Sequence, residues 1–234
     1  MKITPVRTRI FEENENLISF ILKYVKKIPE GSVLAITSKV VALSEGRIVD
    51  YKGAKEKIKL IKKESDFAME TRQVWLTIKN NMVMANAGID ESNAKGKLIL
   101  LPEDSFKSAF EIRNKLKKIF KVKKLGVLIT DSRVFPLRAG IVGVALGYAG
   151  FKGARDYRKT ADIFGRSLNF SRTDVADSLA TSAVLCMGEG REQQPFALIT
   201  DAPVEFVEKV NKKELEIKIK DDLYLPLFRG ILNR

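Results

Sequence analysis

The sequence predicts an α+β fold, and three observations support this. Apolar residues recur at helical spacing in several segments, whereas other apolar runs are short and do not alternate, which is typical of buried strands. No internal repeat or linker divides the chain. Its 234 residues suffice to bury a large core. We therefore expect residues 1–234 to form one domain, or two small subdomains that are intertwined.

The individual elements follow from periodicity and from turn residues. An extended segment at residues 3–11 is fixed by Pro5. Residues 39–43 either continue a strand or begin a helix. Helices are expected at residues 14–27, 55–63, 105–120, 175–187 and 204–210. Asp104 or Ser105 lies near the N-terminal cap of the third helix. Thr173 or Asp174 can cap the fourth helix, which ends at Gly188. Strands are expected at residues 33–38, 48–49, 74–78, 97–101, 125–130 and 196–200.

Composition excludes several classes of protein. No apolar run approaches the roughly 18 residues of a membrane span, and the N-terminus lacks the apolar core of a signal peptide. We therefore expect a cytoplasmic protein. The net charge of +13 suits nucleic acid, an anionic membrane or anionic small substrates. Because the lysines mostly alternate with apolar residues and lack interleaved aromatic residues, we expect solvated faces, no membrane partner and no specific nucleic acid.

The chain contains no histidine and one cysteine, Cys186. The lack of histidine excludes Ser-His-Asp catalysis, Cys-His catalysis and every zinc site that requires histidine. Cys186 lies in the apolar run AVLCMG, so we expect a buried thiol without a catalytic role. Any metal must be held by oxygen atoms, which favours magnesium, manganese or calcium.

Three polar loops follow apolar elements, at residues 90–93, 131–132 and 188–193. The stretch 125–147 is the most informative, because a buried strand there ends in Asp131 and Ser132. Taken alone, Asp131 is more often an ordinary turn residue than a ligand. If the three loops converge, they make an all-oxygen site for divalent ions, but their spacing cannot show convergence. The sequence has no GxxxxGK[ST] phosphate-binding loop.

A further polar loop contains Asp156, Tyr157 and Arg158, followed by residues 162–166. A solvated loop with internal ion pairs and a clamp for a substrate anion are equally good interpretations. In the second interpretation, an arginine pairs with a carboxylate or phosphate through its planar fork.

Taken in order, these motifs resemble the F420-0:gamma-glutamyl ligase family. ANAGIDESN at residues 85–93 is the longest and most specific of them. The others are SKVV at 38–41 with EGR at 45–47, ITDS at 129–132, DYR at 156–158 with Asp162 and FGR at 164–166, and ADSL at 176–179 through MGE at 187–189.

The resemblance implies an α+β fold of two subdomains in a homodimer. It also implies a ligase that uses GTP and Mn²⁺ or Mg²⁺, with two ions and K⁺ as further candidates, to attach L-glutamate to coenzyme F420-0. The implied metal ligands are Asp90, Asp131, Ser132 and Glu189. The implied nucleotide-binding residues are Pro5, Val6, Arg7, Thr8, Ser38, Lys39, Asn93, Gly188 and Gly190. Asp156, Tyr157 and Arg158 are the candidates for substrate binding, and no catalytic residue is assigned.

The chain departs from the family pattern at residues 133–143. Relatives commonly have a Gly-Arg-Pro-Trp-Arg type of segment, whereas this chain has RVFPLR, and Gly143 stands where an acidic residue is expected. The acceptor therefore stays open. The alternatives are a divergent member that ligates an amino acid to another carboxylate, and a non-catalytic relative that binds nucleotide.

Overall fold

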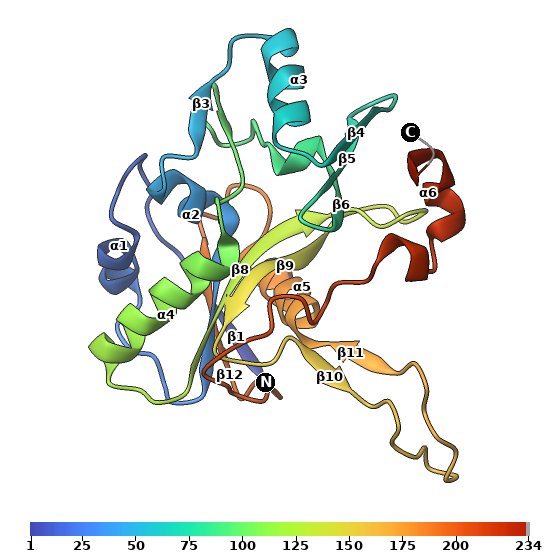
Figure 1. Ribbon diagram of the computed structural model, residues 1–234. Helices are drawn as coiled ribbons and strands as arrows, with labels where there is room; N and C mark the ends of the chain where they lie inside the picture. The colour runs from blue at the N-terminus through green and yellow to red at the C-terminus, as the bar shows by residue number, and fades with distance from the viewer. Residues whose placement is uncertain (233–234) are drawn as a thin grey trace.

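The centre of the molecule is a five-stranded mixed sheet. The computed structural model describes residues 1–232, so the end of the predicted domain, 233–234, lies outside the described residues. The sheet order is β1-β12-β2-β8-β9, and Figure 1 shows it in the lower half of the molecule. Only β2 and β8 are parallel neighbours. The five strands are β1 (Lys2–Val6), β2 (Ser32–Thr37), β8 (Leu125–Arg133), β9 (Val142–Ala149) and β12 (Phe196–Thr200).

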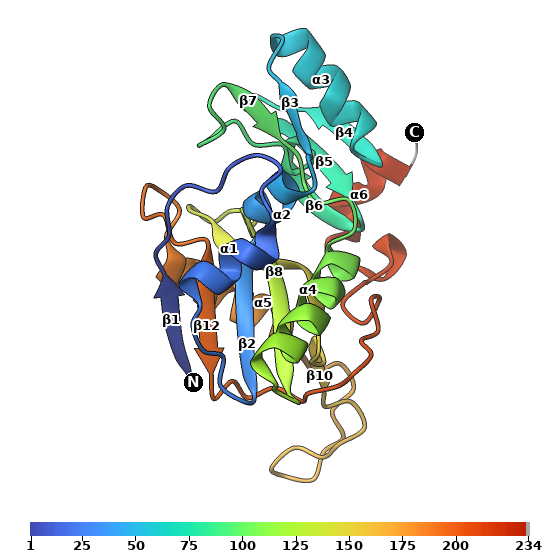
Figure 2. The ribbon, with the colours of Figure 1, turned by 90° about the vertical axis from the view of Figure 1, so that its left-hand side faces the viewer.

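Helices cover both faces of this sheet. One face packs on α1 (Leu17–Tyr24), α2 (Ser38–Ser44) and α4 (Ser105–Phe120), and the other on α5 (Val175–Met187). Figure 2 shows the first three helices in front of the sheet and α5 behind it. Because both faces are covered, β2 is buried along most of its length, which explains its non-alternating apolar sequence. The α+β class predicted from the sequence is confirmed.

A second body, here called the small lobe, is inserted between α2 and α4. It spans residues 48–99 and stands above the central sheet in Figure 1. Its own core is small and is centred on Ile61. A two-stranded sheet, a three-stranded sheet, a helix and one 3₁₀ turn make it up: β3 (Ile48–Asp50) with β7 (Lys97–Ile99), β4 (Phe67–Glu70) with β5 (Trp75–Lys79) and β6 (Met82–Ala85), α3 (Ala54–Lys63) and η1 (Asn86–Gly88).

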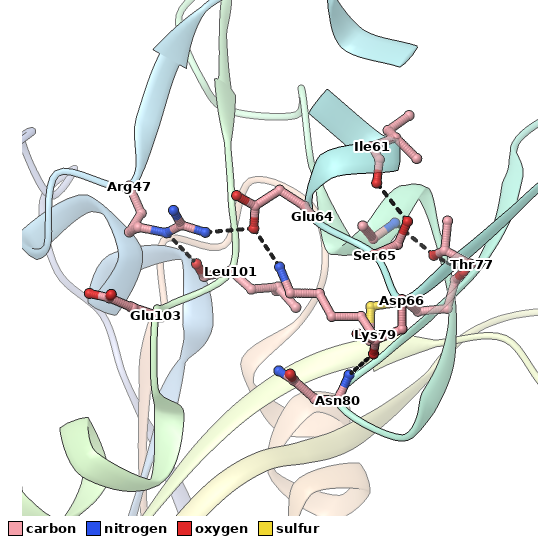
Figure 3. A network of polar contacts seen from close by, with 12 residues as sticks. Arg47, Ile61, Glu64, Ser65, Asp66, Thr77, Lys79, Asn80, Leu101 and Glu103 are labelled. Atoms are coloured by element: carbon pink, nitrogen blue, oxygen red, sulfur yellow. Dashed lines mark hydrogen bonds and ion pairs between the residues drawn. The ribbon is translucent and has the colours of Figure 1, made fainter. Parts of the chain in front are cut away.

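A polar network fixes the small lobe where the chain passes to and from it (Figure 3). The Glu64 carboxylate, at the end of α3, accepts hydrogen bonds from Arg47 Nη2 at 2.7 Å and from Lys79 Nζ at 2.6 Å. Arg47 Nε also donates to the carbonyl oxygen of Leu101 at 3.1 Å. The Glu64 side chain is only 13% exposed, so these charge-assisted bonds are partly shielded from water. The network therefore joins both connecting segments to α3 and β5.

Two further segments leave the compact body. The hairpin of β10 (Ala154–Asp156) and β11 (Arg172–Asp174) projects from the lower end of the sheet in Figure 1. The C-terminal part contains η2 (Ile219–Asp221) and α6 (Leu225–Leu232). Before them, residues 204–215, here called the C-terminal strap, cross the lower end of the sheet. The strap is fastened by Arg113, whose Nη1 and Nη2 lie 3.1 and 3.0 Å from the two carboxylate oxygens of Glu208.

Several expected elements need correction. The strand that begins at Leu125 does not stop before Asp131 but continues to Arg133, because β9 pairs with it that far. No helix forms at 204–210, where the backbone instead bonds to residues 150–152. The thiol of Cys186 is exposed, because α5 buries its other face. The helix expected at 14–27 spans only Leu17–Tyr24. Missed helices and strands are β4, β6, β9, β10, β11 and α6.

Within residues 1–232, no helix has the length and apolar character needed to cross a membrane.

Candidate functional site

The candidate site begins at the shared edge of the two parallel strands. Thr37 of β2 and Thr130 of β8 are register partners, so the next residues, Ser38 and Asp131, leave the paired region together. Ser38 Oγ lies 3.5 Å from Asp131 Oδ1. The two carboxyl ends of parallel strands meet at one edge of a sheet, where open α/β sheets commonly bind ligands. Asp131 is therefore placed by strand geometry rather than by a turn.

The small lobe contributes Asp90 to the same place. A turn at Ala87 and Gly88, both with positive φ, leads into Asp90, whose backbone bonds in both directions with Ile99. Gly88 cannot be replaced freely, because a Cβ there would lie 2.6 Å from Cγ of Leu101. This turn therefore holds the Asp90 backbone in a fixed place on the small lobe.

Lys39 links the small lobe to the central body. Its Nζ lies 2.8 Å from Asp90 Oδ2 and donates to the carbonyl oxygen of Ser92 at 3.2 Å. Burial raises the pKa of the Asp90 carboxyl, but Lys39 and the hydrogen bonds from Ser92 outweigh burial, so that the pKa lies below its ordinary value. Asp90 is therefore ionised at neutral pH, with Lys39 as its counter-ion.

Glu189 completes the convergence of the three polar loops. It follows Gly188, which ends α5 with a φ of 80°. Burial and the neighbouring charges of Asp131 and Asp90 raise the pKa of the Glu189 carboxyl, and the Ser132 side chain and Lys39 partly offset this. Two carboxylates that repel each other at one place are stabilised when a cation lies between them. Asp90, Asp131, Ser132 and Glu189 therefore lie in one neighbourhood around Ser38 and Lys39, near enough for their charges to influence one another.

Sequence reasoning missed Arg133, the last residue of β8. Its Nη1 donates to the Asp131 carboxylate and, at 2.9 Å, to the carbonyl oxygen of Ser132. Asp131 and Arg133 are two residues apart on a strand, which places their side chains on the same face. That spacing was a usable signal for an internal ion pair. Asp90 and Asp131 therefore each face a basic side chain of this chain.

The predicted nucleotide residues lie along the same edge of the sheet. Pro5 and Val6 belong to β1 and pair with Ala197 and Phe196 of β12. The Thr8 amide donates to the carbonyl oxygen of Gln193 at 2.8 Å, which joins the segment Pro5–Thr8 to the loop that contains Gly188 and Gly190. In that loop the Gly190 amide donates a hydrogen bond of 2.7 Å to the Glu192 carboxylate. Ser38 and Lys39 begin α2, and Asn93 is the last residue of the 90–93 loop in the small lobe.

Asp156, Tyr157 and Arg158 lie elsewhere. Ala149, at the end of β9, is the register partner of Val127, so the hairpin that follows starts at the opposite end of the sheet from Asp131. Arg158 Nη2 lies 2.6 Å from Asp156 Oδ2, and this hydrogen bond lowers the pKa of Asp156 to about 2. Within one chain, these residues form their own ion pair and do not join the candidate site. Their role in substrate binding stays a prediction.

The side-chain oxygens of the site are donors of the type that hard divalent ions bind. Three carboxylates and the hydroxyl of Ser132 are the donors that Mg²⁺ and Mn²⁺ prefer. Within residues 1–232, no three acidic, cysteine or histidine side chains lie close enough together to hold an ion by themselves. Mg²⁺ in proteins usually has one or two carboxylate ligands and completes its shell with water and substrate phosphates.

Comparisons with known proteins show the family of this chain. Residues 5–201 match the family model described as F420-0:Gamma-glutamyl ligase. A Methanococcus maripaludis (strain C6) protein named coenzyme F420:L-glutamate ligase is 34% identical over 241 residues, covering 94% of this chain and 96% of its own. The protein of that name from Methanocaldococcus jannaschii is 34% identical and covers 88% and 90%. The one from Methanopyrus kandleri is 35% identical and covers 74% and 75%.

Proposed function

Because the chain belongs to the F420-0:gamma-glutamyl ligase family, whose members form carbon–nitrogen bonds, we propose that it joins L-glutamate to coenzyme F420-0 using GTP and a divalent ion. The observation that supports this most directly is that Asp131, at the carboxyl end of β8, and Asp90, on the small lobe, contact the adjacent residues Ser38 and Lys39, and that the charges of both carboxylates act on Glu189. The carboxylate oxygens of Asp90, Asp131 and Glu189 and the hydroxyl oxygen of Ser132 would hold Mg²⁺ or Mn²⁺, and K⁺ is a further candidate. A bound divalent ion supplies charge neutralisation for the phosphates of the nucleotide.

The reaction proceeds in two transfers. A carboxylate oxygen of the acceptor attacks the γ-phosphorus of GTP, the bond to the β-phosphate oxygen breaks, and GDP leaves. The amine of glutamate then attacks the carbonyl carbon of the acyl phosphate, loses a proton, and expels inorganic phosphate. Both transfers depend on positioning and on charge neutralisation more than on a histidine base, which this chain lacks.

The protein's own residues account for positioning. Lys39, which bridges to Asp90, places a positive charge beside that carboxylate and near enough to Glu189 to lower its pKa. Backbone amides of the Pro5–Thr8 segment and the 188–194 loop, with Ser38 and Asn93, would contact the nucleotide. The net charge of +13 favours the approach of anionic reactants.

The experiment combines the protein with GTP, Mn²⁺ or Mg²⁺, L-glutamate and F420-0. The expected result is release of GDP together with a product heavier by one glutamate, detected by chromatography and mass spectrometry. Asp50→Asn serves as the matched control for acid-to-amide variants in the small lobe, because the Asp50 side chain is 73% exposed. The proposal is refuted if no GDP is released with F420-0 or with any other carboxylate acceptor.

One observation favours a second candidate, a ligase for a different acceptor. The resemblance predicts an acidic residue at position 143, but a Cβ on Gly143 would lie only 2.4 Å from the carbonyl oxygen of Ala180. The backbone of β9 therefore touches α5 there and leaves no space for a carboxylate. The same assay with a panel of carboxylate acceptors separates the two candidates. If GTP and metal stabilise the fold without turnover, the chain is instead a nucleotide-binding relative.

A homodimer is also part of the proposal. The projecting hairpin carries Ile163, Phe164 and Phe170, whose exposed fractions are 92%, 90% and 92%. Large apolar side chains exposed together commonly mark an interface. Sedimentation equilibrium is expected to give twice the chain mass, and a monomer at every concentration would refute this part.

A further inference from the structure

The guanidinium of Arg133 has an edge that its contacts leave open. Arginine has five N–H groups, and its Nε and Nη2 together form a fork that matches carboxylate or phosphate oxygens. Both hydrogen bonds of Arg133 to oxygen use Nη1, which reaches the Asp131 carboxylate and the Ser132 carbonyl. In the part of the chain that the structure describes, the hydrogen-bond partner of Nη2 is the thioether of Met84, at 3.6 Å. Among residues 1–232, the buried Nε has no hydrogen-bond partner.

This open edge is energetically unusual. Arg133 is 9% exposed, so water does not freely replace the missing partners. A buried polar group without a partner costs about 1–3 kcal/mol. The thioether of Met84 is a weak acceptor on a side chain with many rotamers, so it yields readily to a better one. A site that leaves such a fork unsatisfied gains affinity for any oxyanion that fits it.

The position of Arg133 relates this edge to the candidate site. Its Nη1 is bonded to Asp131, which lies beside Ser38 and close to Glu189. Met84 belongs to β6 of the small lobe, so the guanidinium lies between the two bodies that supply the carboxylates.

We propose that Arg133 is the oxyanion-binding residue of this site, holding a carboxylate or phosphoryl oxygen pair of a substrate on its Nε–Nη2 edge while Nη1 stays on Asp131. The assignment deepens the proposed function and rests on it. Two reactants have the required chemistry, the carboxylates of the amino acid and the phosphoryl groups of the nucleotide.

The test replaces Arg133 by lysine, which keeps the charge beside Asp131 but removes the fork. Calorimetric titrations of the metal-free chain with L-glutamate and with inorganic phosphate measure binding without turnover. The dissociation constant of one probe is expected to rise at least tenfold, equivalent to about 1.4 kcal/mol. The probe affected identifies the source of the oxyanion. Arg72→Lys is the matched control, because Arg72 is exposed in the turn between β4 and β5.

Two measurements keep the assignment falsifiable. Circular dichroism establishes that Arg133→Lys is folded. If the variant does not fold, the ¹⁵N resonance of the Arg133 Nε–H is followed in the unaltered chain and is expected to shift on saturation with one probe. The assignment is overturned by unchanged affinities in a folded variant, by an unmoved resonance, or by an unaltered chain that binds neither probe. The binding titrations require no turnover. A failed ligase assay, which would refute the proposed function, is therefore observed separately from a failed binding titration, which would refute the role of Arg133.

Discussion

Arg113→Met tests how the C-terminal strap is held. The side chain of Arg113 is 2% exposed, and its Nε donates to the carbonyl oxygen of Leu125 at 2.7 Å. Methionine preserves much of the apolar stem but leaves that buried carbonyl without its donor. A hydrogen bond from a charged group contributes about 1.5–3 kcal/mol. The ion pair with Glu208 adds at most about 1 kcal/mol, because the Glu208 side chain is 71% exposed.

The free energy of unfolding is therefore expected to fall by about 3 kcal/mol. For a chain of this size, each kcal/mol corresponds to about 2–4 °C, so the melting temperature should fall by about 6–12 °C. Differential scanning calorimetry measures this directly. Glu208→Gln is the comparison variant, because it weakens only the exposed ion pair and should lower the melting temperature by no more than about 4 °C. Equal effects of the two variants would refute the reasoning that the buried carbonyl bond dominates.

Three further predictions concern pH, the site and the turn before it. The pKa of Glu208, lowered to about 2 by its hydrogen bonds to Arg113 and Lys117, gives stability that is present above the ordinary pKa near 4.3 and lost as pH falls toward 2. Acid titration followed by circular dichroism should show this loss, and Glu208→Gln should remove it. Asp90→Asn and Asp131→Asn should each abolish metal-dependent activity while the protein still folds. Full activity of either variant would contradict its assignment as a metal ligand. Gly88→Ala should lower the free energy of unfolding by about 2–4 kcal/mol in urea titrations, because it combines a positive φ with contact to Leu101. A value below about 1 kcal/mol would show that the turn relaxes.

Much of the central body follows from local sequence signals. Asp104 caps α4 by accepting from the Lys107 amide, and Asp174 caps α5 in the same way through Asp177. The buried strands β2, β8 and β12 were recognisable because their apolar runs are short and do not alternate. These features depend on neighbours within a few residues, which a single sequence displays.

Other features depend on partners that are distant in sequence. β8 continues through Asp131 because β9 pairs with it after a register shift between Ile129 and Thr130. Lys39 meets Ser92 across 53 residues, and no local pattern marks that contact. The apolar residues Val204 and Val210 suggested a helix, but they pack against the sheet along an irregular strap instead. Tertiary contacts decided each of these cases.

The position of the small lobe has a consequence for ligand binding. Asp90 belongs to a body with its own minor core, and the chain enters and leaves this body through two neighbouring segments. A reactant that contacts both Asp90 and Asp131 acts as a temporary cross-link between them. By linkage, the free energy that such a cross-link gains from an ordered lobe equals the free energy by which it orders the lobe. Loosening the lobe at β4 or β5, far from any reacting atom, would therefore weaken affinity for the same ligand.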